Sequence, residues 1–359
     1  MPDLSFFVIC LYFPCQGFAG FQDFGLLQLA CHLAFSKYGG REAINTPAAI
    51  IAFIMLRVTF LGTGGSLPTR NRNPSAVMVN REGELLLFDC GEGTQQQMMR
   101  AKTGMMSLSS IFISHFHADH FLGVPGLIQT MSFMGRTEAL TIYGPQGTGE
   151  FTELFRALGF FRLRYEVRGV DLRPGDVLER EGYSIHALRT EHSVPSLGYA
   201  LVENMRPGRF NRERAIELGV TPGPLFAKLQ RGEPVKVEDR TISPEEVVGV
   251  PRPGRSLVYT GDTRPCEAVL EASRDTDLLI HDGSFADEMA DWAGESMHST
   301  AGEAATLAKE AGVRQLVLTH ISSRYSDDST PVLTDAKKVF EEVLVADDLM
   351  ELELSYQKE

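Results

Sequence analysis

Three imidazoles and one carboxylate stand within six residues, in the segment Ser114-His115-Phe116-His117-Ala118-Asp119-His120. The segment directly follows Ser110–Ile113, a short and mostly apolar run that is typical of a buried strand. Imidazole and carboxylate groups are zinc-type ligands, and the end of a strand holds such groups rigidly at a sheet edge. A solvated polar loop has no need of so many histidines. The spacing therefore predicts a metal cluster.

Polar residues farther along the chain extend this pattern. They are His192 in Glu191-His192-Ser193, Asp262 in Gly261-Asp262-Thr263, and His320 in Thr319-His320. Taken singly, each could be an ordinary polar residue or a turn former. Together with His115-x-His117-x-Asp119-His120, and with Asp89 in the segment Phe88–Gly93, they resemble in chain order the motifs of the metallo-β-lactamase superfamily. The resemblance implies an α/β fold, a four-layered αβ/βα sandwich.

The same resemblance implies two zinc ions per subunit and their ligands. One ion is expected on His115, His117 and His192, and the other on Asp119, His120 and His320, with Asp262 bridging both. Asp89 is expected to support these ligands from outside. A zinc pair about 3.5–4 Å apart lowers the pKa of bound water to about 7 and stabilises both oxygens of a displacement. The same ligands can also hold manganese or iron.

Three further segments resemble one family within this superfamily, tRNase Z. The first is the loop Pro68-Thr69-Arg70-Asn71-Arg72-Asn73, which resembles the family's PxKxRN loop with Arg70 in place of lysine. The second is Met297-His298-Ser299-Thr300-Ala301, which resembles its HST loop. The third is Gly219–Pro224 followed by Lys228, which resembles the Gly/Pro motif of its protruding tRNA-binding arm. The resemblance runs from Met55 to about Leu354.

This family resemblance implies a zinc-dependent endoribonuclease that removes the 3′ trailer of precursor tRNA. Cleavage after the discriminator nucleotide would leave a 3′-hydroxyl on the tRNA. Asp119 would orient or deprotonate the attacking water, and His298 would protonate the departing O3′. Asp282 would hold His298, although it stands where the family has a glutamate, one methylene longer. The family also implies a homodimer in which one subunit's arm grips the tRNA that the other subunit cleaves.

The net charge of −13 by itself argues against a nucleic-acid partner, but the charge is unevenly distributed. Between Glu203 and Gly232, six basic residues face three acidic ones, so this stretch carries +3. A solvated helix face of mixed charge is the simpler interpretation. With the family resemblance, phosphate contacts are favoured. The residues expected to bind substrate are Pro68, Arg70, Arg72, Asn73, Arg206, Arg209, Arg212, Arg214 and Lys228.

Two other functions remain open at this stage. A small-molecule metallohydrolase, such as a thioesterase of the glyoxalase II type or an arylsulfatase-like protein, would have the same ligands but no need of a basic Gly/Pro arm. A metal-stabilised RNA-binding scaffold would require a vacant ligand position, and all seven positions are filled. No apolar run reaches the roughly 18–20 residues of a membrane span, which argues against a membrane partner. Five scattered cysteines favour a reducing, cytoplasmic setting.

The elements that must position these residues alternate between strands and helices from Met55 onward. Strands are predicted at Leu56–Leu61, Ser110–Ile113, Gly198–Val202, Leu257–Thr260, Leu278–His281 and Gln315–Thr319, with a hairpin at Val77–Val79 and Leu85–Phe88. Helices are predicted at Phe121–Phe133, Thr148–Leu158, Thr300–Ala311 and Asp335–Val345. Residues 203–255, rich in Pro, Gly and charge, are expected to form the arm within a domain of residues 55–359. Residues 1–54 are expected to be an extension that contributes no motif, with Met55 as a candidate start.

Overall fold

The structure is a computed structural model that describes residues 56–357. Residues Met55–Glu359 form a structural unit of their own. The expectations for residues 1–54 lie outside the described residues.

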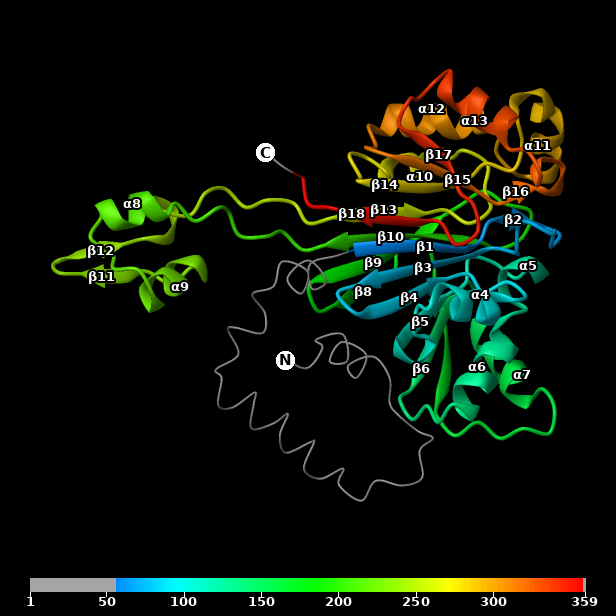
Figure 1. Cartoon of the computed structure of the whole chain (residues 1–359), viewed down its shortest axis with the longest axis horizontal. Coiled ribbons are helices and arrows are strands. Elements are labelled where there is room, and N and C mark those ends of the chain that lie inside the picture. The colour runs from blue at the N-terminus through cyan, green and yellow to red at the C-terminus, as the bar shows by residue number, and fades with distance from the viewer. Residues whose placement is uncertain (1–55, 358–359) are drawn as a thin grey trace, which may run out of the picture. The chain divides into compact units, whose positions relative to one another are not determined.

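Two seven-stranded sheets form the centre of this unit (Figure 1). The first sheet has the order β18-β1-β3-β4-β5-β6-β7 and the second β17-β15-β14-β13-β10-β9-β8. The strands of the first sheet are β1 (Leu56–Gly62), β3 (Ala76–Arg81), β4 (Glu84–Phe88), β5 (Leu108–Phe112), β6 (Leu140–Gly144), β7 (Val167–Asp171) and β18 (Glu351–Leu354). Those of the second are β8 (Val177–Arg180), β9 (Tyr183–Arg189), β10 (Leu197–Glu203), β13 (Ser256–Tyr259), β14 (Leu278–Asp282), β15 (Leu316–Thr319) and β17 (Val343–Val345). The predicted hairpin is confirmed, since β3 and β4 pair antiparallel with Val79 opposite Leu86.

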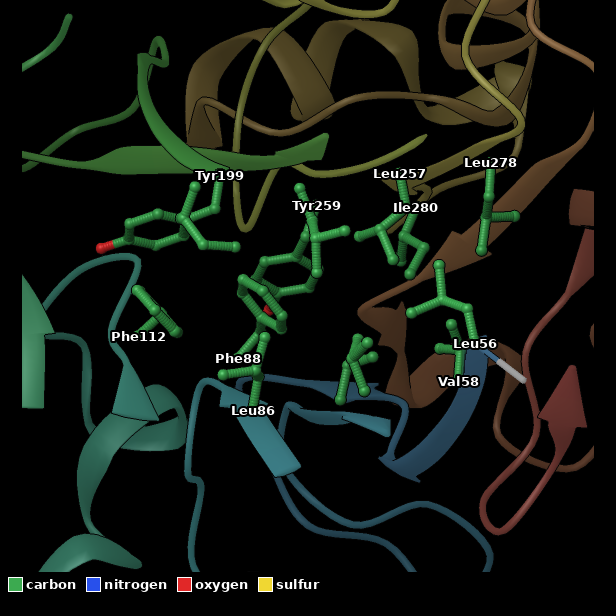
Figure 2. Packing of buried hydrophobic residues seen from close by; sticks show 14 of the residues in the cluster. Leu56, Val58, Leu86, Phe88, Phe112, Tyr199, Leu257, Tyr259, Leu278 and Ile280 are labelled. Carbon is green, nitrogen blue, oxygen red and sulfur yellow. The ribbon is translucent and has the colours of Figure 1, made fainter. Parts of the chain in front are cut away.

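The main core lies between the two sheets, where aromatic side chains from both meet (Figure 2). Phe88 of β4 stacks on Phe112 of β5 at 5.2 Å, and the rings of Tyr199 and Tyr259 approach Phe88 from the second sheet at 5.9 and 5.7 Å. These side chains are almost completely buried. Because β4 and β13 are covered on both faces, they consist largely of consecutive apolar residues rather than alternating ones.

Helices cover the outer face of each sheet, and apolar clusters fill the space beneath them. On the first sheet they are α4 (Thr94–Ala101), α5 (Ala118–Phe121), α6 (Val124–Phe133) and α7 (Thr148–Ala157). On the second they are α10 (Glu267–Ala272), α11 (Ala290–Ser296), α12 (Ala301–Ala311) and α13 (Thr330–Lys337). The order helix, sheet, sheet, helix confirms the predicted four-layered sandwich.

Helix α12 shows how local sequence sets an element. Thr300 caps its first turn by accepting from the Glu303 amide, while the Glu303 carboxylate accepts from the Thr300 amide, and Gly312 ends the helix at a φ of 69°. Its buried face consists largely of alanines, which lets the helix lie close to the sheet. The predicted helices at Thr148–Leu158 and Thr300–Ala311 are confirmed, whereas α6 begins at Val124 because α5 ends at Phe121.

The predicted helix at Asp335–Val345 is wrong. The helix in this region, α13, begins at Thr330 with Pro331 in its first turn and ends at Lys337. Val343–Val345 is instead the edge strand β17, parallel to β15 with Val317 opposite Leu344. A short run of apolar residues fits either periodicity, and here an open sheet edge and β-branched valines favour the strand.

The segment between β10 and β13 leaves the second sheet and returns to it, although these two strands pair with each other. It carries α8 (Arg212–Glu217), α9 (Pro224–Gln230), β11 (Val235–Val237) and β12 (Arg240–Ile242), which Figure 1 shows grouped at the end of two extended stretches. This group has a small core of its own, made of Ala215, Val220, Leu229, Val235, Ile242 and Val247. We call residues 203–255, the range expected from the sequence, the arm.

Shorter elements complete the described chain. They are β2 (Gly64–Gly65), β16 (Ile321–Ser322) and the 3₁₀ turns Met105–Ser107, Pro244–Glu246, Asp287–Met289 and Ser323–Tyr325. Within residues 56–357, no helix is both long enough and apolar enough to cross a membrane.

Candidate metal centre

The polar residues singled out from the sequence lie at the carboxyl ends of strands. β4 and β5 run parallel in the first sheet, and β13, β14 and β15 run parallel in the second. The carboxyl ends of parallel strands meet at one edge of a sheet. Residues that directly follow β5, β9, β13 and β15 therefore come together from both sheets: His115–His120, His192, Asp262 and His320.

Four of these residues form a first group of ligand atoms. Nδ1 of His117 lies 3.1 Å from Nε2 of His115 and 3.2 Å from Nε2 of His192. Oδ2 of Asp262 lies 3.6 Å from Nε2 of His115 and 4.0 Å from Nε2 of His192.

A second group shares the same oxygen of Asp262. Oδ2 of Asp262 lies 3.2 Å from Nε2 of both His120 and His320. Oδ2 of Asp119 lies 3.5 Å from Nε2 of His120 and 3.3 Å from that of His320. All seven predicted ligands thus converge, with Asp262 common to both groups.

The spacing of these atoms suits metal ions. Two atoms bound at about 2.0–2.1 Å to one tetrahedral ion lie about 3.4 Å apart, which matches the separations within each group. Nε2 of His120 and Oδ1 of Asp262 are buried and have no hydrogen-bond partner among the described residues. A buried polar atom without a partner is costly unless something else binds it. The donor set of imidazoles and carboxylates fits zinc.

Four of the five ligand imidazoles are oriented through the nitrogen that faces away from the centre. Nδ1 of His120 lies 2.7 Å from Oδ2 of Asp89, and Nδ1 of His192 lies 3.0 Å from the carbonyl oxygen of Met297. Because these oxygens can only accept, Nδ1 donates, and Nε2 of a neutral ring keeps its lone pair for a ligand. Nδ1 of His115 lies 3.0 Å from Oγ of Ser114, and Nδ1 of His320 lies 2.8 Å from Oγ of Ser284.

Asp89 anchors the centre to both sheets. Its carboxylate is fully buried and accepts from the Ser114 amide and hydroxyl, each at 2.7 Å, and from the Tyr259 hydroxyl at 2.6 Å. Asp89 was expected to support the ligands, and the structure brings it to His120. The sequence analysis missed Ser114, Tyr259 and Ser284, since no spacing pattern distinguishes a buried hydroxyl that orients a ligand.

Burial and charge set the protonation states of His115 and Asp119. Burial and the neighbouring His120 imidazole hold the pKa of His115 well below its usual value, so this ring is neutral. Burial opposes ionisation of Asp119, but its contacts with His120 and His320 lower its pKa far below the usual range. Asp119 is therefore a carboxylate, and its Oδ2 also accepts from the Ser66 amide at 2.7 Å.

A second imidazole–carboxylate pair stands beside the centre. Nδ1 of His298 lies 2.8 Å from Oδ2 of Asp282, and the His298 ring stacks on the His320 ring at 5.0 Å. The shorter carboxylate thus reaches His298 despite the missing methylene. Burial lowers the pKa of His298, but the Asp282 carboxylate outweighs it and raises the pKa to about 9. His298 is consequently protonated at neutral pH.

Arg264, which the sequence analysis did not single out, fixes the backbone at His298. Its guanidinium donates to the carbonyl oxygen of His298 at 2.6 Å and forms an ion pair with Glu303 of α12. In the sequence, only its position two residues after Asp262 could have indicated this role. The loop that carries the predicted ligand Asp262 therefore also holds the loop that carries the protonated ring of His298.

The comparisons with known proteins agree with this geometry. A family model described as "Beta-lactamase superfamily domain" matches residues 217–321, and one described as "Anti-Pycsar protein Apyc1" matches residues 56–151. Ribonuclease Z of Methanosarcina acetivorans is 78% identical over 305 residues, which cover 85% of this chain and 100% of that protein. Ribonuclease Z of Archaeoglobus fulgidus is 51% identical over 306 residues, 85% of this chain and 100% of that protein. This chain belongs to the ribonuclease Z family.

A solved structure agrees with this family assignment. The short form of human tRNase Z matches with a TM-score of 0.60 and 30% identity, over 82% of this chain and 98% of that one. The predicted family is thus confirmed.

In this chain, the loop Pro68–Asn73 differs from expectation at two positions. Arg72 is buried, and its guanidinium donates to Thr63 and Ala346 and pairs with Asp347 at 2.7 Å. Asn73 donates to Asp348 at 2.8 Å through both its backbone and its side chain. Arg72 therefore has no free guanidinium for a phosphate, and both residues hold the loop in place. Pro68 and Arg70 are exposed.

The basic residues of the arm differ in their accessibility. Arg209, Arg212, Arg214 and Lys228 are exposed, with Arg214 paired to Glu217 at 3.0 Å. Arg206 is only partly exposed, because its guanidinium lies 3.5 Å from the centre of the Tyr356 ring at the base of the arm.

Proposed function

We propose that this chain removes the 3′ trailer of precursor tRNA by zinc-dependent hydrolysis. Cleavage would follow the discriminator nucleotide and leave a 3′-hydroxyl on the tRNA. The observation that carries the proposal is the pair His298–Asp282 beside a seven-ligand centre, in a chain that is 78% identical to a ribonuclease Z.

Incubation with a precursor tRNA that carries a 3′ trailer tests this function. We expect one endonucleolytic cut after the discriminator nucleotide, loss of activity on chelation, and recovery with zinc. Metal analysis should find two ions per chain. A chain that hydrolyses small thioesters or sulfate esters but leaves the tRNA intact would instead be a small-molecule metallohydrolase.

The residues around the centre suggest how the reaction proceeds. When bound, two zinc ions acidify water and neutralise charge that develops on the phosphate oxygens. The Asp119 carboxylate orients the attacking water and accepts its proton. His298, whose ring stacks on that of His320, donates a proton to the departing O3′, while Asp282 keeps its ring charged and correctly turned.

Replacing His298 with alanine should leave both metal sites intact and slow precursor cleavage about 10²–10⁴-fold, the usual contribution of a general acid. None of the predicted metal ligands depends on His298 alone for its position. A substrate with an activated leaving group needs no proton, so its hydrolysis by the variant should stay close to that of wild type. Single-turnover rates on both substrates, together with metal content, provide the measurement. Equal impairment on both substrates would make His298 structural.

The variant Asp282→Asn provides a matched control. Without this carboxylate, His298 loses the main group that raises its pKa, and burial, opposed by the Asp262 carboxylate, lowers that pKa below about 9. Because the general acid must be protonated, the alkaline limb of the kcat/KM profile should move to lower pH. An unchanged alkaline limb would mean that His298 is not the proton donor.

We also propose that a second copy of this chain covers an exposed apolar patch. The patch lies at the ends of α6 and α7 and consists of Phe133, Met134, Leu154, Leu158 and Phe160, all at least half exposed. The rings of Phe133 and Phe161 lie 4.7 Å apart, so the patch is continuous across both segments. Contiguous exposed apolar groups of this kind are typical of protein interfaces. This supports the expected homodimer.

The double variant Phe133→Asp/Phe160→Asp should be monomeric, because two charges would have to be buried at the interface. Val177→Asp, which places the same charge on exposed β8, should leave the dimer intact. Sedimentation equilibrium distinguishes the two. A dimeric double variant would place the interface elsewhere.

Three expectations remain proposals on this basis. Residues 1–54 are proposed to be an extension outside the enzyme domain, in keeping with the Methanosarcina acetivorans protein, which aligns over its whole length with 85% of this chain. The arm and the exposed Arg70 are proposed to contact tRNA phosphates. A cytoplasmic location is proposed from the sparse cysteines; Cys90 and Cys266, within the described residues, are free thiols.

A further inference from the structure

The two ends of the arm meet in a buried ion pair. Glu203 is the last residue of β10 and Arg255 directly precedes β13, and each side chain is at most 3% exposed. Nε and Nη2 of Arg255 donate to the two carboxylate oxygens of Glu203 at 2.8 and 2.7 Å. Arg81 of β3, in the first sheet, adds a third bond to Glu203 at 2.9 Å. Both ends of the arm are therefore tied to both sheets.

The C-terminal tail crosses this ion pair. After β18 ends at Leu354, Tyr356 places its ring 4.2 Å from the Arg255 guanidinium and 3.5 Å from that of Arg206, both measured to the ring centre. Arg255 belongs to the buried ion pair, whereas Arg206 lies on the outgoing stretch of the arm. A guanidinium against a ring face is attracted to it, more strongly where water is excluded.

The outgoing and returning stretches are also bonded to each other at this level, where Nε of Arg206 donates to the carbonyl oxygen of Pro253 at 3.3 Å. Arg206 and Arg252 exchange backbone hydrogen bonds at 2.7 and 2.9 Å, and the guanidinium of Arg252 donates to Pro207 at 3.3 Å. Nη1 of Arg255 also donates to the carbonyl oxygen of Leu354 in the tail, and the ring of Tyr356 adds a contact that reaches the outgoing stretch and the ion pair together. A small change in backbone direction at this point displaces the far end of the arm by a larger distance.

We propose that Tyr356 is a positioning residue that fixes the direction of the arm. The inference rests on the proposed function, in which the arm binds precursor tRNA. An arm held in its binding direction loses less conformational freedom when RNA binds, so the ring lowers KM for tRNA. Tyr356 takes no part in the chemistry.

Replacing Tyr356 with alanine should raise KM for precursor tRNA about fivefold to thirtyfold, the effect of losing two cation–π contacts. The kcat for tRNA and the hydrolysis of a nitrophenyl phosphodiester should not change. Tyr356→Phe keeps the ring face and should restore the wild-type KM. Gln357→Ala, which removes only the tail's 3.2 Å bond to Asp277, is the matched control and should have no effect.

Hydrogen exchange measured without RNA tests the positioning role of Tyr356 independently of tRNA binding. The amides of Arg206 and Arg252 should exchange faster in Tyr356→Ala than in wild type or Tyr356→Phe. Faster exchange with an unchanged KM would support the positioning role and contradict tRNA binding by the arm. Unchanged exchange, or an equal loss of activity on the small ester, would overturn the inference.

Discussion

Replacing Asp119 with alanine is expected to abolish precursor tRNA cleavage while leaving tRNA affinity nearly unchanged. Asp119 belongs to the second ligand group, and its Oδ2 is 3.3–3.5 Å from two ligand nitrogens. The variant loses the carboxylate that orients water and weakens a metal site that contributes several kcal/mol, so kcat should fall by about 10³-fold or more. The exposed residues proposed to bind phosphates lie elsewhere and are unaffected.

Single-turnover cleavage and an RNA-binding titration together measure this separation. Asp291→Ala, which removes an exposed carboxylate from α11, is the control and should behave like wild type. Metal content measured on the same samples shows whether the second ion is lost. Cleavage by Asp119→Ala within about tenfold of wild type would contradict the assignment of this centre to catalysis.

The metal centre was predictable from the sequence because its ligands obey local rules. His115, His117, Asp119 and His120 share one short segment after a buried strand, and strand ends meet at one sheet edge. The remaining ligands could be placed only through the superfamily motif order, since a lone histidine or aspartate carries no spacing signal. Tyr259, which donates to Asp89, comes from the opposite sheet and was not predictable.

Arg72 shows why the substrate-binding loop was predicted less well. Its type and its place in a basic loop suggested a phosphate ligand. Its partners, Ala346 and Asp347, lie more than 270 residues away in sequence. Whether an arginine is free depends on such distant acceptors, which composition and motif cannot reveal. The same holds for Val343–Val345, whose strand conformation depends on the neighbouring edge of β15.

The arm was visible in the sequence only as a break in the strand–helix rhythm. Pro, Gly and charge indicated an insertion, but its own apolar core was hidden among short apolar runs. That core has a functional consequence. Because the arm buries its apolar residues within itself, it can be removed without exposing the core between the sheets.

Removing the arm should therefore separate RNA recognition from chemistry. The bond from the Gly249 amide to the Arg209 carbonyl, 2.9 Å long, marks where the two stretches lie side by side. Replacing residues 210–248 with two glycines closes the chain there as a hairpin and keeps the Glu203–Arg255 ion pair. The deletion removes the exposed basic residues Arg212, Arg214 and Lys228.

Hydrolysis of a nitrophenyl phosphodiester should persist in this deletion, because a small ester reaches the ligand cluster without the arm. Precursor tRNA depends on remote phosphate contacts to bring its scissile bond to the centre, so its kcat/KM should collapse. Neutralising one exposed arginine, as in Arg212→Gln, should lower the salt slope of tRNA binding by up to about one unit, and the deletion by about the sum of its phosphate contacts. Equal loss on both substrates would make the arm structural. If the deletion left tRNA cleavage undiminished, the tRNA would have to be recognised by the exposed Pro68–Arg70 loop beside the centre. The acidic remainder of the chain repels RNA.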